Sequence, residues 1–218
     1  MTLADGTAIT QGGAGLLCMN CHQARQNAAT YTATTAGNSH YGAHHGPQAD
    51  MLQGVNAVTY GKRIPSSAHA DVVDDTCATC HMQATAATDA AFLKAGGHTF
   101  KPSFTDANGN KVELVAACKG CHGPDVTTFN FPLFDYNDDG TIDGVQTEVQ
   151  KLLDQLSTLL PPDNKVKSTL NIDSTWTNQQ LKAAYNWQFV HDDGSLGIHN
   201  TAYTVGILKA SIADLTKN

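Results

Sequence analysis

The chain has 218 residues, a formal net charge of −7 and a pI near 5.7. This balance excludes nucleic acid as an expected partner, because nucleic acid is bound through clustered Lys and Arg side chains. No stretch approaches the roughly 18 consecutive apolar residues of a membrane helix, so we expect no membrane span. Aromatic residues make up only 7% of the chain, which is little for an all-protein core, and we expect another buried apolar group to complete it.

The chain begins without a recognisable export signal. Residues 1–6 (MTLADG) lack the basic start and the apolar stretch of a secretory signal peptide. We therefore expect the sequence to be either the mature part of an exported protein or a piece cut from a longer chain, and the initiating Met before loop-like sequence favours the second.

All six cysteines fall into three copies of the pattern Cys-x-x-Cys-His, at 18–22, 77–81 and 118–122. This pattern is typical of c-type haem attachment: both thiols form thioethers with the haem vinyl groups, and the histidine binds the iron. The sequence therefore predicts three haem c groups, held by Cys18, Cys21 and His22, by Cys77, Cys80 and His81, and by Cys118, Cys121 and His122.

Other uses of paired cysteines explain this pattern less well. Disulfides do not require a histidine after every second cysteine, and structural zinc would leave an odd set of half-sites. A redox dithiol needs one such pair near a strand–helix unit, not three. Because haem is joined to this motif on the far side of the cytoplasmic membrane, we expect an exported protein, periplasmic or extracellular.

A histidine-rich and glycine-rich run follows the first motif, at 40–47. One of His40, His44 and His45 is a candidate distal iron ligand, either here or in a missing N-terminal part or a neighbouring subunit. Alternatively, the run is a polar loop whose histidines hydrogen-bond haem propionates. The sequence leaves both interpretations open.

An acidic loop at 135–143 matches the first nine positions of an EF-hand loop, with Gly140 at the sharp turn. Position twelve is Gln146 where a bidentate Glu is expected, and Glu148 stands two residues later as a substitute. The predicted calcium ligands are Asp135, Asn137, Asp139, Thr141 and Glu148. The alternative is an Asx-rich turn that caps the next helix.

Three helices are predicted after this loop. An apolar stripe of helical period covers 145–160 and stops at Pro161-Pro162. Thr177 and Gln180 form a capping box that opens a second helix through 189, with His191 near its end in a capping role. A third helix runs from about Asn200 through Ile212.

The fold class follows from these elements: mainly α with much irregular loop, a haem-cored multihaem cytochrome c with little or no sheet. Residues 1–122 form the triple-haem attachment region, and residues 123–218 carry the acidic loop and helices that pack back on the haems. We expect one compact unit. If the last 96 residues were a separate helical domain, His199 would not be an iron ligand.

Seven histidines remain outside the motifs, and Met51 is the only methionine placed to reach an iron. Histidines are therefore in excess over irons, and we predict bis-histidine, low-spin haems of low potential throughout.

The segments 67–69, 77–82, 96–100 and 197–203 resemble the multihaem cytochromes of the cytochrome c nitrite reductase and cytochrome c554 superfamily. The resemblance covers roughly 14–218 and is closest to multihaem cytochromes of metal-reducing bacteria. It implies these distal ligands: His199 opposite His81, His69 opposite His122, and His98 opposite His22.

The expected function is electron transfer to redox partner proteins or extracellular acceptors. One alternative is a fragment of a nitrite or hydroxylamine reductase. Such an enzyme needs an open iron position, and the family's catalytic Cys-x-x-Cys-Lys motif is absent here. The other alternative is self-association into a conductive filament, for which the surplus histidines at 40–45 are suited.

Overall fold

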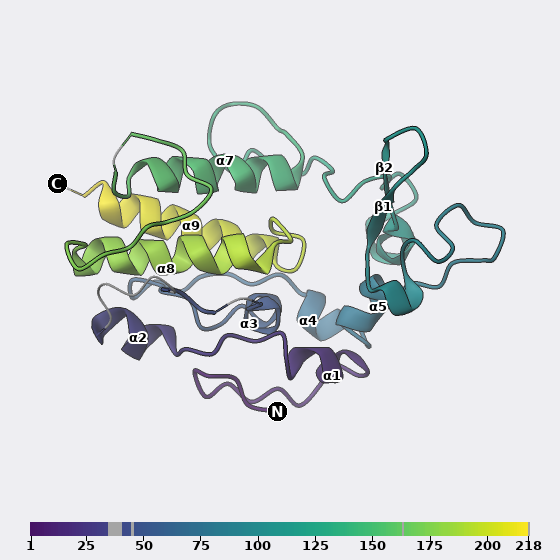
Figure 1. Ribbon diagram of the computed structural model, residues 1–218, viewed down its shortest axis with the longest axis horizontal. Coiled ribbons are helices and arrows are strands. Elements are labelled where there is room, and N and C mark those ends of the chain that lie inside the picture. The colour runs from purple at the N-terminus through teal and green to yellow at the C-terminus, as the bar shows by residue number, and fades with distance from the viewer. Residues whose placement is uncertain (35–40, 45, 163, 218) are drawn as a thin grey trace.

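The computed structural model describes residues 1–34, 41–44, 46–162 and 164–217. Three long helices dominate it: α7 (Val145–Thr158), α8 (Asn178–Asp193) and α9 (Thr201–Leu215) (Figure 1). The shorter elements are α1 (Gly15–Met19), α2 (Ala28–Thr34), α3 (Gln48–Gln53), α4 (His69–Val72), α5 (Cys77–His81), η1 (Gly97–Thr99), β1 (Ser103–Thr105), β2 (Lys111–Glu113), η2 (Val115–Cys118) and α6 (Lys119–His122). The prediction of a mainly helical chain with much loop and little sheet is confirmed. Within the described ranges no helix has the length and apolarity needed to cross a bilayer.

Local sequence explains where the long helices begin. The capping box predicted at α8 is present, because the Thr177 side chain accepts from the Gln180 backbone N–H and the Gln180 side chain accepts from the Thr177 N–H. Gly194 then ends α8 in the left-handed conformation that glycine adopts without strain. Helix α9 starts at Asn200, whose side chain accepts from the Tyr203 N–H.

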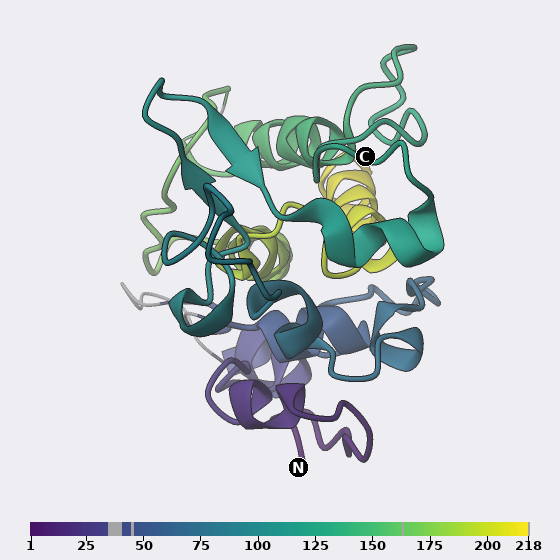
Figure 2. The ribbon, with the colours of Figure 1, turned by 90° about the vertical axis from the view of Figure 1, so that its right-hand side faces the viewer.

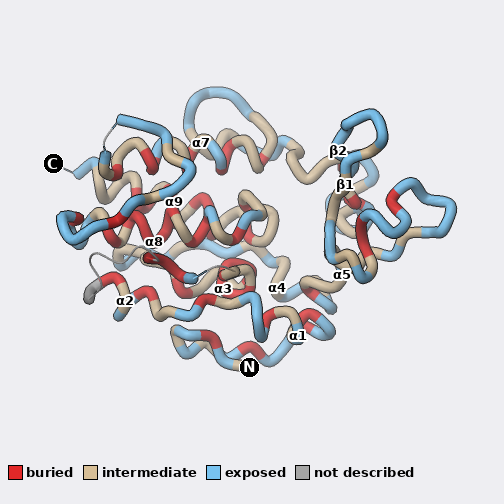
Figure 3. The backbone as a smooth tube through the Cα atoms, viewed as in Figure 1, coloured by how far each residue is buried: buried red, intermediate tan, exposed pale blue. Residues whose placement is uncertain are grey.

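Helix α8 is the centre of the main core. It packs against α7 and α9, and also against α2 and α3. Tyr185, Trp187 and Phe189 on this helix are at most 2% exposed, and Figure 3 shows buried residues concentrated along it. These three aromatic side chains of α8 are therefore almost completely buried, and each contributes roughly 1.5–3 kcal/mol through burial.

The main core joins the two halves of the sequence. Ala24, Ala28 and Met51 belong to the same hydrophobic cluster as Leu152 of α7 and Leu208 of α9. Residues on both sides of position 122 thus share one core formed by side chains.

A smaller lobe at one end of the molecule carries the hairpin (Figure 1), and Figure 2 shows this end facing the viewer. Strands β1 and β2 pair antiparallel, with Ser103 opposite Glu113 and Thr105 opposite Lys111. The Asp106 carboxylate closes the turn by accepting from the backbone N–H groups of Asn108 and Asn110. These bonds, chiefly the one from Asn110, lower the pKa of Asp106.

Asn200 connects the start of α9 to the segment that precedes α4. Its Oδ1 accepts from the backbone N–H of Ser67 at 2.7 Å, and its Nδ2 donates to Ser66 Oγ at 2.8 Å and to the Leu52 carbonyl at 3.2 Å. The side chain is fully buried. One amide therefore holds the residues before His69 against the residue after His199.

Replacing Asn200 with Ala removes the helix cap and these three long-range bonds. We expect the free energy of unfolding to fall by at least about 2 kcal/mol, because buried donors and acceptors lose their partners. Denaturant unfolding measures this loss. Asn178→Ala is the control, since Asn178 donates one bond, to the Thr32 carbonyl, and should cost only about 1 kcal/mol; equal costs for the two variants would contradict the assigned role.

Candidate functional site

The three cysteine motifs lie on neighbouring helices at one end of the molecule. Helix α5, with the second motif, packs against α1 of the first and against η2 of the third. Cys18 lies beside Cys77, and Cys118 beside Cys80; burial raises the pKa of Cys77 and Cys80, and these neighbours add to the rise. No disulfide joins any of the six cysteines in the structure.

A glycine permits the close approach of the first two motifs. A Cβ on Gly15 would lie 1.9 Å from Thr76 Oγ1, so only glycine fits in α1 at this contact. Thr76 in turn donates to the Gly12 carbonyl at 2.9 Å, and Asp75 accepts from the Ala14 N–H at 2.8 Å. Backbone and short side chains thus fix the spacing of the first two cysteine motifs.

In each of two histidine pairs, rings from distant parts of the sequence lie close together. The ring centres of His81 and His199 are 6.2 Å apart, and those of His69 and His122 are 5.9 Å apart. A metal–imidazole nitrogen bond is about 2 Å long, so two imidazoles on opposite sides of one iron have ring centres roughly 6 Å apart. Both pairs fit this spacing, and they are the pairs that the family resemblance implies.

Four histidines, two from the motifs and two candidate distal ligands, each have an oxygen acceptor at Nδ1 that holds the ring in place. His69 Nδ1 lies 3.1 Å from the Ile198 carbonyl, and His81 Nδ1 lies 2.9 Å from the Phe100 carbonyl. His22 and His199 use side-chain oxygens of Gln48 and Asp193, at 3.1 and 2.6 Å. An acceptor at Nδ1 keeps the proton there and leaves the Nε2 lone pair for a metal, the arrangement found for metal-bound histidines.

The Asp193 contact differs from the others because it carries charge. Its carboxylate is 1% exposed and also accepts from the backbone N–H and hydroxyl of Ser195. Burial by itself lowers the pKa of His199, but the charge of Asp193 and the hydrogen bond to it outweigh burial, and the pKa is raised.

The distal partner of His22 is not identified. His98 is exposed, on η1, and is not in ring contact with His22. His40 and His45 lie outside the described residues, and His44 is exposed. The assignment of His98 to this iron stays a prediction.

Met51 and His191, which were also weighed as iron ligands, make packing contacts with other side chains of the protein. Met51 is fully buried in the main core, where its sulfur accepts from the Thr204 hydroxyl. His191, in the last turn of α8, stacks on Trp187 with ring centres 4.7 Å apart.

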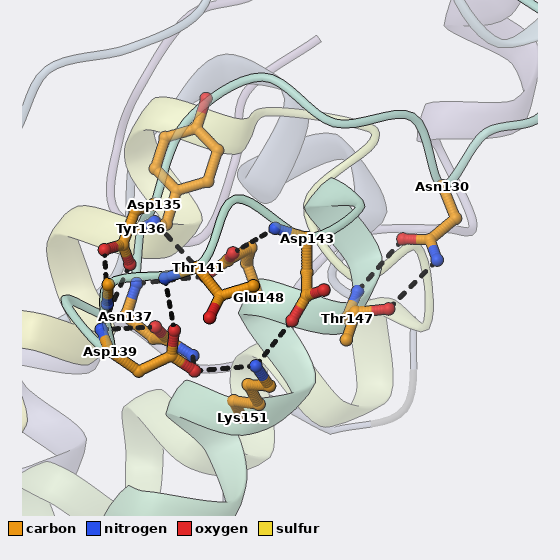
Figure 4. Close-up of polar contacts among 11 residues, drawn as sticks. Asn130, Asp135, Tyr136, Asn137, Asp139, Thr141, Asp143, Thr147, Glu148 and Lys151 are labelled. Atoms are coloured by element: carbon orange, nitrogen blue, oxygen red, sulfur yellow. Dashed lines mark hydrogen bonds and ion pairs between the residues drawn. The ribbon is translucent and has the colours of Figure 1, made fainter.

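The acidic loop has the internal hydrogen bonds of a tight Asx turn (Figure 4). Asp135 accepts from the N–H groups of Asp139 and Gly140, and Asn137 Oδ1 also accepts from Asp139. Thr141 N–H donates to Asp139 Oδ1. The loop positions named from sequence therefore lie together before α7.

Glu148 fastens this loop to α7. Fully buried, it accepts from the backbone N–H groups of Tyr136 and Asn137 with one oxygen and of Asp143 with the other. Its expected position near the loop is thus observed, with backbone N–H groups as partners.

Lys151 supplies a cation to the same loop (Figure 4). Its Nζ contacts Asp139 at 2.7 Å and Asp143 at 2.5 Å, and the Lys151 contact lowers the pKa of Asp139 to about 2. In the part of the chain that the structure describes, no three His, Cys, Asp or Glu side chains converge as a metal-ligand set. Calcium binding stays a prediction from the sequence.

Sequence reasoning did not assign Asp193 or Gln48 to the candidate site. Asp193 contacts the ring of His199, six positions away, and Gln48 contacts the ring of His22, 26 positions away. The only sequence signal was the Asp-Asp-Gly run at 192–194, which indicates a helix end.

Comparison of the chain with protein-family models, with curated proteins and with solved structures gives no match.

Replacing Glu148 with Gln should destabilise the protein by roughly 1–3 kcal/mol, because an amide nitrogen would then face buried backbone N–H donors. Chemical denaturation reports the loss. Asp154→Asn on the same helix removes a charge from a partly exposed side chain that accepts from Gln150, and should change stability by less than about 0.5 kcal/mol. A Glu148→Gln variant as stable as wild type would contradict the fastening role.

The calcium prediction has its own test. If the loop binds Ca²⁺, adding the ion should raise the unfolding temperature, because a ligand that binds only the folded state stabilises it. Scanning calorimetry with Ca²⁺ and with a chelator measures this, and Asp135→Asn should abolish the difference. Identical curves in Ca²⁺ and chelator would refute the prediction.

Proposed function

We propose that this chain is an exported electron-transfer protein, a multihaem c-type cytochrome with three covalently attached haems. The observation that carries the proposal is the pairing of His81 with His199 and of His69 with His122 at the spacing of two axial ligands. Each pair combines a motif histidine with a histidine that lies outside the three motifs. Three copies of Cys-x-x-Cys-His, using every cysteine, support covalent attachment independently.

The residues would divide the work as follows. The two cysteines of each motif would hold the group covalently, and the motif histidine would bind the iron from one side. His199 and His69 would close the opposite faces of the second and third irons. When bound, the haems would supply reversible one-electron chemistry between a reduced partner and the next acceptor.

The arrangement of the helices supports an order for the three centres. Helix α5 contacts both α1 and η2, which favours the second centre in the middle of a row. Filled axial positions leave no coordination site for a substrate, and this argues for transfer over catalysis at the second and third irons. Redox proteins or extracellular acceptors are the proposed partners.

The position opposite His22 on the first iron has no assigned ligand. The two alternative functions, a filament subunit and a reductase, differ in what would fill it. A ligand from the histidine-rich run, within one chain or from a neighbouring subunit, would keep the first iron low-spin, and the second case would build a filament. An open face would instead allow a small ligand to bind, as in a reductase. Carbon monoxide binding to the native reduced protein at one third of its haems would favour the open face.

His199→Ala and His69→Ala should each convert one haem of three to the high-spin form, because each removes one axial ligand. Optical and electron paramagnetic resonance spectra of the holoprotein measure the high-spin fraction. His199→Met is a useful second variant, since Met is the other common axial ligand and should restore a low-spin haem with a higher potential.

His191→Ala is the matched control. His191 is exposed and stacks on Trp187, so its removal should leave the spin states of all three haems as they are in the wild-type protein. A fully low-spin spectrum after His199→Ala would overturn the proposed pairing, and a purified wild-type protein without covalent haem would overturn the proposed function itself.

A further inference from the structure

The oxygen acceptors behind the paired histidines are chemically unequal. Within the pair His69–His122, the acceptor at His69 is the neutral carbonyl of Ile198, at 3.1 Å. Within the pair His81–His199, His81 also has a neutral carbonyl, but His199 has the Asp193 carboxylate at 2.6 Å. Among the described acceptors of these two pairs, only the one at His199 is therefore anionic.

The surroundings of Asp193 preserve its charge and its direction. The side chain is 1% exposed, so bulk water and salt screen it little. Its second oxygen accepts from the Ser195 hydroxyl and backbone N–H, which are neutral donors that leave the negative charge in place. The turn after α8, with Gly194 in the left-handed conformation, holds the carboxylate against Nδ1.

A carboxylate at Nδ1 draws the ring proton toward itself and increases the electron donation of Nε2. Such outer partners raise the basicity of a metal-bound imidazole. A more basic axial ligand stabilises the ferric state over the ferrous state and so lowers the reduction potential. A neutral carbonyl does the same more weakly, because hydrogen bonds to charged groups are the stronger ones.

We infer that Asp193 is a positioning residue that acts through His199 and holds the reduction potential of the His81–His199 centre below that of the His69–His122 centre. This inference rests on the proposed function. It assigns the middle position of the row to the more reducing of the two centres, so an electron passing from the middle to the third centre moves downhill.

The test is the isosteric variant Asp193→Asn in the holoprotein, which keeps an oxygen acceptor and removes the charge. Spectroelectrochemical titration should show one of the three potentials rising by at least about 59 mV, equivalent to a tenfold change in a one-electron equilibrium. The other two should stay in place, and the spectrum should stay low-spin.

Asp192→Asn is the matched control, because Asp192 is the adjacent carboxylate and its described side-chain contacts are with His191 and Gln188. This variant should shift none of the potentials by that amount. Equal shifts in Asp192→Asn and Asp193→Asn, or three unchanged potentials in Asp193→Asn, would overturn the inference.

A second measurement does not need the Asp193 variant to fold. The low-spin potential that disappears in His199→Ala should be lower than the one that disappears in His69→Ala, and the reverse order would overturn the inference. Failure of the proposed function looks different: a wild-type protein without covalent haem, or one whose second and third haems are high-spin.

Discussion

The docking of the turn between α8 and α9 on the N-terminal half is the contact on which the candidate site depends. The turn carries Asp193, Ile198 and His199, and its last residue, Asn200, is hydrogen-bonded to the segment before α4. The Ile198 carbonyl orients His69, while His199 itself faces His81. One tertiary contact thus arranges a member of each histidine pair, and its strength comes from a buried amide with four partners and from the apolar core behind it.

Orientation of the rings is a matter of electrostatics as well as packing. An imidazole with an acceptor at Nδ1 has one tautomer and one direction for its lone pair, and it loses little entropy on binding a metal. The chain uses backbone carbonyls for two of these acceptors and side chains for two more. A backbone carbonyl is always neutral, whereas a side-chain acceptor can be neutral or charged. The side-chain acceptors are therefore the ones through which the sequence can change the electron donation of a ligand histidine.

Much of the helical part of the fold was predictable from local sequence. The capping box at Thr177 and the apolar stripe over 145–160 act within one or two helical turns, so neighbours in sequence are sufficient to specify them. The hairpin at 103–113 was not predicted, because its strands have three residues each and carry too little alternation. The acidic loop was recognised as a motif, but the buried role of Glu148 depends on how α7 enters, which is a tertiary property.

The sequence by itself determined the three Cys-x-x-Cys-His motifs, since the residues of each motif lie only three or four positions apart. It also contains seven further histidines, and spacing cannot choose among them as partners of the motif histidines. Only the tertiary structure decided that His199 faces His81 and that His69 faces His122, across 118 and 53 positions. It also decided that Asp193 reaches His199. Contacts of this kind depend on how helices dock, and helix docking is set by the whole core and not by any one segment.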